Sequence, residues 1–291
     1  MKPPSSDQLE DIYEKHAKYL RKEDGGEQAN FSSMDLRNID LSNRNLREAN
    51  LFRANLKGVN LVSANLTDAN LERANLEEAN LSFAKLAGIN FSDANLCYAN
   101  LSGAKLTGAS ITDANLEAVN LEGANLMGAD CSDSNIRGAN LKNANLMGAN
   151  FNDANLTGSN LRGVNLTCAT LCDAMLSGAN LDEANIMGAK LTDANLSGAN
   201  LQGANLMEVK LTDANLSGAN LQNANLTSAK LTDANLSGAN LKDANLMDAD
   251  LEDANLSGTN LSGANFEHAY IEGANIRDAD LSNVINLATR K

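Results

Sequence analysis

An apolar residue recurs at every fifth position of this chain, from Phe31 to Leu281, without an insertion or a deletion. We call this apolar position the centre of each pentapeptide and number its neighbours from it. The minus-two position is then mostly Ala, and the minus-one position is mostly Asn. A helix repeats every 3.6 residues and a strand every two, so neither explains a period of five. The repeat instead predicts short extended segments joined by regular turns, with the centre and the minus-two residue inside.

A second period of twenty residues is visible at the variable positions. At the plus-two position, Gly recurs at every fourth pentapeptide from Gly138 to Gly258, and Asp does so from Asp93 to Asp253. Residues 191–250 consist of three near-copies of one twenty-residue unit. We therefore predict that four pentapeptides form one coil. The chain would hold about 13 coils, stacked at about 4.8 Å, the spacing of hydrogen-bonded strands.

The repeat Ala-Asn-Leu-x-x, maintained over residues 29–283, resembles the pentapeptide-repeat family. The resemblance implies an all-β fold, a right-handed quadrilateral β-helix whose centre and minus-two side chains point inward. It is specific for the fold and says little about function, because most members of that family have no established activity. Leu and Ala dominate the composition, and aromatic residues make up only 3% of it, as one small core layer repeated many times would require.

We expect three parts in the chain. An N-terminal capping helix with its linker would span residues 1–28, the repeat would span 29–283, and a C-terminal tail or cap would span 284–291. A stacked coil exposes unpaired edges at both ends, so each end requires a cover or a partner.

The N-terminal cover is predicted as a helix over residues 5–24. Ser5 and Gln8 have the spacing of a capping box, and apolar residues follow at helical spacing. Gly25 and Gly26 would end the helix. At the other end, Val284, Ile285 and Leu287 could fold over the last coil or serve a homodimer through the C-terminal end. Residues 284–291 are too few to form much of a lid, so we favour the dimer.

The Asn residues at the minus-one position form the most regular outward-facing row. Identical amides about 4.8 Å apart can donate to one neighbour and accept from the other, so we interpret this row as structural. The Gly row fits the third position of a type II turn, where φ is positive. For the Asp row we predict a different turn, in which each carboxylate accepts a main-chain N–H two residues further on.

The Asp row, which we call the Asp column, is the first candidate surface for a partner. It contains Asp93, Asp113, Asp133, Asp153, Asp173, Asp193, Asp213, Asp233 and Asp253. The carboxylates either cap turns or form an anionic stripe for a basic partner or divalent cations, and the sequence leaves both interpretations open. Lys190, Lys210 and Lys230 interrupt the Asn row nearby, and we interpret them as charge compensation copied with the coils.

A row of methionines at the plus-one position, the Met column, is the second candidate surface. It contains Met127, Met147, Met187, Met207 and Met247, with Thr167 and Thr227 between them. Exposed thioethers can form an adaptable contact strip. Duplication of coils without any use of the methionines is the alternative, and it also stays open.

Few residues are suited to catalysis or to a cofactor. His16 and His268 have no plausible nucleophile beside them in the register, and we expect His16 to pack at the cap. Cys131 is a centre and should be buried, whereas the other three cysteines should point outward and lack the spacing of a zinc site. The glycines follow the turn period and do not form a phosphate loop. We therefore predict a non-enzyme without metal or cofactor.

Charge and hydropathy limit the location and the partners. The net charge of -14 disfavours direct binding to nucleic acid or to an anionic membrane. No apolar run is long enough to span a membrane, and no signal peptide is recognisable, so we expect a cytoplasmic protein.

Three functions remain after these exclusions. The leading hypothesis is a rigid scaffold that mediates protein–protein interaction through flat faces. The alternative rests on the resemblance: some members mimic duplex DNA and bind DNA gyrase or topoisomerase IV, which gives quinolone resistance. Nearly all the net charge lies beyond residue 73. B-DNA carries about one charge per 1.7 Å, and the charge density of this chain is less than half of that. The loop insertions of those members are also missing. A structural or adhesive role through end-to-end stacking is the third.

Overall fold

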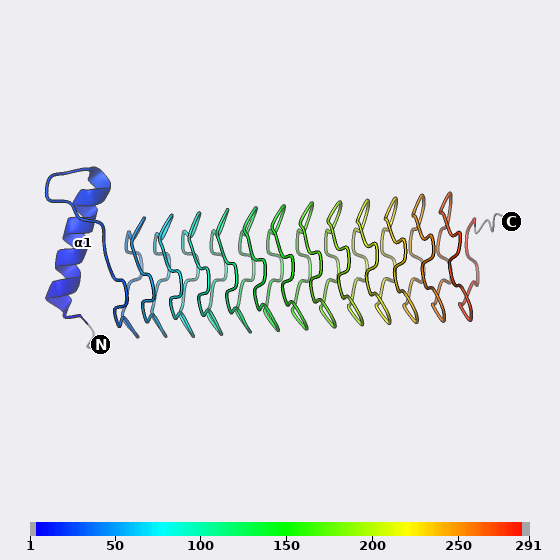
Figure 1. The fold of residues 1–291 in the computed structure, drawn as a ribbon, viewed down its shortest axis with the longest axis horizontal. Helices are drawn as coiled ribbons and strands as arrows, with labels where there is room; N and C mark the ends of the chain where they lie inside the picture. The colour runs from blue at the N-terminus through cyan, green and yellow to red at the C-terminus, as the bar shows by residue number, and fades with distance from the viewer. Residues whose placement is uncertain (1–3, 287–291) are drawn as a thin grey trace. The chain divides into compact units, whose positions relative to one another are not determined.

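A computed structural model describes residues 4–286 of the chain. The chain divides into two compact units, residues 1–140 and residues 141–291. Each unit is built from the same twenty-residue coil (Figure 1). The first unit also contains α1, which spans Ser6–Arg21 and is the one helix among the described residues.

The start of α1 confirms the predicted capping box. Gln8 Oε1 accepts the backbone N–H of Ser5 at 2.8 Å, and Ser5 Oγ accepts the backbone N–H of Gln8 at 3.3 Å. Asp7 lies in the first turn, where a negative charge interacts favourably with the helix dipole. Two N–H groups that a helix start leaves without partners are therefore satisfied by side chains.

The end of α1 differs from the prediction. The helix ends at Arg21, and Lys22 follows it with a left-handed φ of 60°. The backbone N–H of Lys22 donates to carbonyl groups of the last turn and closes it. The prediction that Gly25 and Gly26 end the helix was wrong, because a non-glycine residue adopts the left-handed cap three residues earlier.

Parallel bridges join residues twenty positions apart in both units. Asn30 pairs with Asn50 in the first unit, Asn145 pairs with Asn165 in the second, and the step of twenty repeats through each unit. Four pentapeptides therefore make one coil, as the period of the variable positions predicts. The bridges fall on minus-one residues, and between residues 4 and 286 no longer strand forms. The expected extended segments are reduced to single residues because the rest of each pentapeptide forms a turn.

The backbone N–H groups show why the coils stack so regularly. The centre and plus-two N–H groups donate to the following coil, as Leu51 does to the carbonyl of Asn70 at 2.7 Å, and the minus-one N–H donates to the preceding coil. The N–H of the next minus-two residue closes the turn, as Ala54 does on the carbonyl of Leu51 at 3.0 Å. The fifth donor, the plus-one N–H of Phe52, bonds Asn50 Oδ1 at 3.1 Å. All five donors of the pentapeptide are satisfied.

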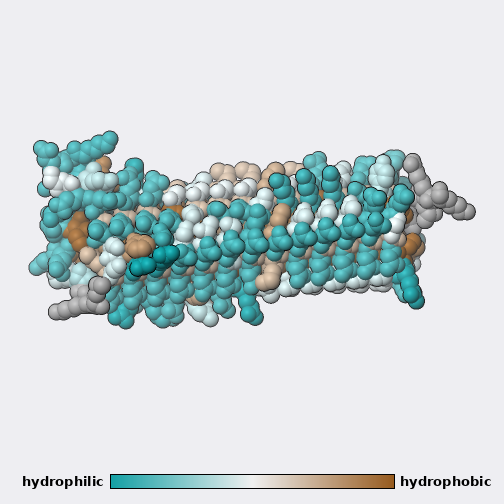
Figure 2. Space-filling model, viewed as in Figure 1, coloured by the Kyte–Doolittle hydropathy of each residue, from teal (hydrophilic) through white to brown (hydrophobic). Residues whose placement is uncertain are grey.

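The core of each unit consists of the centre and minus-two side chains. Leu101 of the first unit and Leu211 of the second are 1% and 0% exposed, and the surface in view is mostly hydrophilic (Figure 2). Where the minus-two residue carries a hydroxyl, it stays buried and bonds its own turn: Ser159 and Thr259 donate to the preceding centre carbonyls at 2.7 Å. A buried hydroxyl is thus accepted because it has a local acceptor.

The turns are alike on all four pentapeptides of a coil. In the coil that starts at Leu191, the plus-two residues have φ of 58° at Asp193, 64° at Gly198, 62° at Gly203 and 58° at Glu208. The prediction of a different turn for the Asp column was therefore wrong. Asp tolerates the left-handed region better than most side chains, so it serves the same backbone conformation as Gly.

The C-terminal end of the described chain continues the coil. Ile285 bridges Asn265 in the same register, so it extends the ladder and does not fold over it. Leu281 and Ile285 are 38% and 51% exposed, in contrast to the buried centres before them. Leu287, which we placed near a C-terminal contact, lies outside the described residues.

Candidate interaction surfaces

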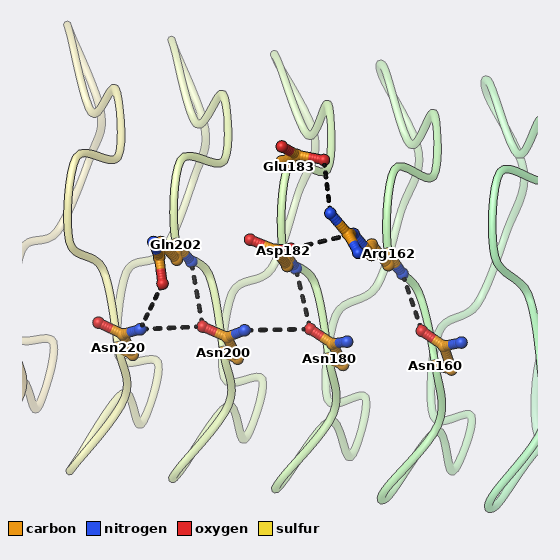
Figure 3. Close-up of polar contacts among 8 residues, drawn as sticks. All are labelled: Asn160, Arg162, Asn180, Asp182, Glu183, Asn200, Gln202 and Asn220. Atoms are coloured by element: carbon orange, nitrogen blue, oxygen red, sulfur yellow. Dashed lines mark hydrogen bonds and ion pairs between the residues drawn. The ribbon is translucent and has the colours of Figure 1, made fainter.

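The side-chain amides at the minus-one position form the predicted ladders. Figure 3 shows one in the second unit, where Asn200 Nδ2 donates to Asn180 Oδ1 at 3.1 Å and Asn220 Nδ2 donates to Asn200 Oδ1 at 3.0 Å. Asn180 Oδ1 also accepts the backbone N–H of Asp182 at 3.2 Å. Each amide therefore fixes its own turn and binds the next coil. The ladder agrees with the prediction from the sequence. The turn cap, which we predicted for the Asp column, belongs to Asn instead.

All nine members of the Asp column are exposed. Three belong to the first unit and six to the second. Among residues 4–286, Asp93 alone of the nine has a polar side-chain partner, because Arg73 Nε donates to it at 3.2 Å. The turn-capping interpretation is wrong for a simple reason. The N–H two residues after Asp193, that of Asn195, already donates to the carbonyl of Ala174 at 2.9 Å. In each unit the members of the Asp column are thus exposed carboxylates.

Three lysines replace Asn on consecutive coils of the second unit. Lys190, Lys210 and Lys230 bridge one another in register, and all three are exposed. Their side chains make no ion pair with any residue of the described chain. Charge compensation by direct contact with the Asp column is therefore not present.

The lysines also leave main-chain donors free. A lysine has no acceptor atom, so it cannot take over the turn cap that Asn Oδ1 provides. Within the described chain the N–H groups of Thr192, Thr212 and Thr232 accordingly have no acceptor. The equivalent N–H of Ser197, which follows an Asn, bonds Asn195 Oδ1 at 3.0 Å. A Lys in the Asn row is therefore the signal in the sequence for a turn without a cap. An Asp at this position keeps the cap, since Asp130 Oδ1 accepts the N–H of Ser132 at 3.2 Å.

The Met column faces outward in both units. Met127 of the first unit is 36% exposed, and Met147 and Met187 of the second are 40% and 36% exposed. Met207 and Met247 are half-buried. A sixth methionine, Met175, is exposed at a minus-one position outside the column. The outward orientation agrees with the prediction, and no contact of these residues decides between use and simple duplication.

α1 packs on the first coil of its own unit through rings and an ion pair. The Tyr13 and Phe31 ring centroids are 6.2 Å apart. The guanidinium of Arg44 lies 4.4 Å from the Tyr13 centroid and pairs with Glu10 at 2.9 Å. Arg44 takes a minus-two position that is usually Ala, so this exception to the repeat has a partner in the helix.

His16 is the buried polar residue of this contact. It is 1% exposed, and its Nδ1 accepts the backbone N–H of Ala29 at 3.1 Å. Burial lowers the pKa of His16, which keeps the ring neutral and Nδ1 free to accept. The predicted packing of His16 at the cap is confirmed. His268, the other histidine, has an exposed side chain.

Other site chemistry is sparse. Cys131 is buried, which raises the pKa of its thiol, while Cys168 is exposed and Cys97 and Cys172 are half-buried, all as predicted. Between residues 4 and 286, no three His, Cys, Asp or Glu side chains come together as metal ligands would. In the same span no helix has the length and apolar character to cross a membrane.

The family follows from the repeat and the coil together. A model of pentapeptide repeats matches overlapping segments that run from residue 27 to residue 283. The chain belongs to the pentapeptide-repeat family. Comparison of this pentapeptide-repeat protein with curated proteins gives no match.

Solved structures of other pentapeptide-repeat proteins are similar to the chain. HetL, involved in heterocyst differentiation regulation in the cyanobacterium Nostoc sp., is 29% identical; the match covers 94% of this chain and 98% of HetL, with a TM-score of 0.32. Rfr23 from the cyanobacterium Cyanothece is 33% identical over 45% of this chain and 90% of its own, with a TM-score of 0.32. QnrB1, a plasmid-mediated fluoroquinolone resistance protein, is 19% identical; the match covers 67% of this chain and 87% of QnrB1, with a TM-score of 0.43.

Proposed function

We propose that this pentapeptide-repeat protein is a rigid, non-catalytic scaffold that binds protein partners through exposed side-chain columns. The proposal rests on a contrast between the backbone groups, which are hydrogen-bonded within the coils, and the side chains of the Asp column, most of which have no partner in the described coils. The backbone donors of a regular pentapeptide are all used within the coils, whereas the Asp column is exposed and, beyond Asp93, has no partner among the described residues. A fixed backbone that displays free side chains in register is suited to recognition.

The two columns favour different partner chemistry. The Asp column offers carboxylates to a basic protein surface, which it would attract over a distance. The Met column offers thioethers, which adapt to apolar surfaces of varied shape. Met147 and Met187, each more than a third exposed, are the members best placed for contact in the second unit.

The proposal extends to the finer fold and the location. We propose a right-handed quadrilateral β-helix of about 13 coils over residues 29–283, a capping helix region over 1–28 and a tail over 284–291. The step of twenty between bridged residues and the contacts of α1 with the first coil support it. We also propose a cytoplasmic protein without cofactor, metal, membrane contact or direct nucleic-acid binding. The net charge of -14 supports the last two points.

A pull-down from the native cell tests the Met column. The variant changes Met127, Met147, Met187, Met207 and Met247 to Gln, and the control changes the exposed Met175 alone to Gln. We expect the control to capture the same partners as the unaltered chain and the five-fold variant to lose them. Identical partner profiles for all three proteins would exclude the Met column.

A second pull-down tests the Asp column. The variant changes Asp153, Asp173 and Asp253 to Asn, and the control changes Asp243 and Asp248, plus-two residues of other pentapeptides with φ of 57° and 56°, to Asn. We expect basic partners to be lost in the variant and kept in the control. Equal loss in both would show that general acidity, and not the column, attracts them.

The alternative function, DNA mimicry against gyrase or topoisomerase IV, shares the acidic surface and needs its own test. A supercoiling assay with the purified protein at micromolar concentration separates the two. Inhibition of supercoiling would replace the scaffold proposal, and no effect would remove the alternative.

We also propose a homodimer through the C-terminal end. The exposed Leu281 and Ile285 side chains on a continuing ladder support it, because an open edge is a ready surface for pairing. The change Leu281→Lys should convert the dimer to a monomer in sedimentation velocity. An unchanged dimer would exclude this contact.

A further inference from the structure

Three consecutive coils of the second unit carry an ordered array that combines both charges. Each coil contributes a Lys at the minus-one position, a Thr at the plus-one position and an Asp at the plus-two position of one pentapeptide. The array consists of Lys190, Thr192, Asp193, Lys210, Thr212, Asp213, Lys230, Thr232 and Asp233. We call it the Lys–Thr–Asp array. Within one coil these three positions lie next to one another, as Figure 3 shows for Asn180, Asp182 and Glu183 of another pentapeptide.

The array is unsatisfied in the single chain. Its lysines and aspartates are exposed, and none of them forms an ion pair within residues 4–286. The N–H groups of its three threonines have no acceptor in the described chain, because Lys has replaced the Asn that caps this turn elsewhere. One side of the array therefore holds only donors, and the other side holds only acceptors.

Like charges in each column also repel one another. Bridges hold Lys190, Lys210 and Lys230 on successive coils, so their ammonium groups start from backbones about 4.8 Å apart. The same coils hold the aspartates. A partner that places opposite charges at this spacing along both columns would relieve both repulsions at once.

The surface that meets this requirement is the array itself. A second copy has the same coil spacing. It carries the Lys column, which consists of Lys190, Lys210 and Lys230, at the same distance from the three Asp-column members of the array. We propose that two copies of this chain pair laterally through the Lys–Thr–Asp array, with the Lys column of each copy facing the Asp column of the other.

The charges fix the orientation of this pairing. When the coils of the two copies run in the same direction around a two-fold axis parallel to the stack, each Lys column faces an Asp column. When the copies run in opposite directions, Lys faces Lys and Asp faces Asp. The parallel arrangement is therefore the attractive one, and the small threonines between the columns permit close approach.

The residues beyond the array limit its length. Thr170 precedes the Lys column and Asp250 follows it, and in the aligned pair Asp250 would face Asp253 of the second copy. The attraction is confined to three coils, which makes the association weak and sensitive to salt. This pairing does not depend on the proposed partner binding, because it requires the lysines, which that proposal does not use.

Charge reversal with complementation tests the pairing. One variant carries K190D, K210D and K230D, a change that Asp130 and Asp250 show to be compatible with the minus-one position. The other carries D193R, D213R and D233R, because Arg53 and Arg73 hold the same plus-two position with φ of 54° and 59°. Each variant alone should lose the lateral dimer, and an equimolar mixture should recover it as a heterodimer.

Sedimentation velocity of the full chain over a concentration series is the measurement. Raising NaCl from about 20 mM to about 300 mM shortens the Debye length from about 20 Å to about 6 Å, so the unaltered protein should dissociate at least about tenfold more readily. A control with K85D, K105D and K242D makes the same change in net charge outside the array and should still dimerise. Circular dichroism of each variant establishes that it is folded.

Zero-length cross-linking locates the contact. A carbodiimide joins Lys to Asp, and mixing protein of natural and heavy isotope content separates links within one copy from links between copies. Links between the Lys and Asp columns of different copies are expected. The proposal is overturned if the folded variants fail to associate when mixed, if association is independent of salt, or if the links lie elsewhere. A salt-resistant dimer sensitive only to Leu281→Lys would indicate the C-terminal contact alone.

Discussion

The first coils and the duplicated coils have the same backbone conformation, but in the described chain surface charges form ion pairs in the first coils and not in the duplicated ones. In the first coils Arg37 pairs with Asp35 at 2.7 Å, and Lys57 pairs with Glu77 at 2.9 Å. Hydrogen bonds from Arg37 lower the pKa of Asp35 to about 2. In the duplicated coils, residues 191–250, no charged side chain has an ion-pair partner in the described chain. The coil therefore does not need surface ion pairs, and the duplicated coils can present free charges to a partner.

Phe31→Ala should have the largest effect, because it removes the packing contact between the first coil and α1. Phe31 is fully buried and its ring packs against Tyr13. Truncation of a buried Phe costs about 3–5 kcal/mol. We expect α1 to detach while the duplicated coils stay folded. Hydrogen exchange should show loss of protection in residues 6–21 with little change in residues 191–250. Uniform loss throughout would mean that the two regions are not independent.

Acidification should act on the first coils next. The lowered pKa of His16 in the folded chain means that its contribution to stability is fully present above the unfolded pKa of about 6.5. It is lost as the pH falls through the folded-state value, because protonated Nδ1 cannot accept the N–H of Ala29. The Tyr19 ring stacks on His16 with a centroid distance of 5.9 Å. Against the larger effect of burial, the backbone of Arg47 and the half-buried Glu48 carboxylate raise the pKa of His16.

Helix content from pH 8 to pH 5.5 measures this effect. The variant His16→Asn places an amide oxygen near the position of Nδ1 and does not titrate, so it should lose the pH dependence in this range. If the variant and the unaltered chain responded alike to pH, His16 would not be responsible.

Asn215→Ala tests the ladder in the duplicated coils. Asn215 Oδ1 accepts the N–H of Ser217 at 3.1 Å and the amide of Asn235 at 3.4 Å. Leaving such donors without an acceptor costs about 1–3 kcal/mol. We expect a lower midpoint of denaturation, whereas Asn215→Asp, which keeps an acceptor, should cost less. Equal losses would place the stability elsewhere than in the turn cap.

Lys210→Asn should have the smallest effect and the opposite sign. The new amide restores the acceptor that the N–H of Thr212 lacks, which is worth about 0.5–1.5 kcal/mol. Increased stability in denaturant would confirm that Lys210, in place of the Asn that caps the turn, lowers the stability of the folded chain. A decrease would indicate that the lysine stem stabilises the coil by packing.

The repeat predicts much of this fold from sequence. The apolar residues repeat every five positions and the variable residues every twenty, which predicted the twenty-residue coil that the bridges show. The spacing of Ser5 and Gln8 predicted the start of α1. The role of Asp193 could not be predicted in the same way. Asx turns are possible for Asn and Asp alike, and the choice depends on which N–H groups the next coil has already used.

The candidate interaction surfaces were predictable as positions and not as functions. Periodicity places the Met and Asp columns on the outside, and the structure agrees. The N–H groups beside the Lys column are free in the described chain because the hydrogen bond to Asn Oδ1, which caps this turn elsewhere, is missing there. A sequence shows that Asn is replaced at Lys210, but the lost turn cap becomes apparent only when the five donors of a pentapeptide are traced.

Residue-resolved hydrogen exchange of matched plus-one amides tests the central claim most directly. Ser197 and Ser217 follow Asn and have capped N–H groups, whereas Thr192 and Thr212 follow Lys on the same coils and do not. The account predicts that the Ser amides exchange about tenfold more slowly than the Thr amides after correction for intrinsic rates. Equal protection of the two sets would contradict it, because the Lys column would then leave no donors free for a partner.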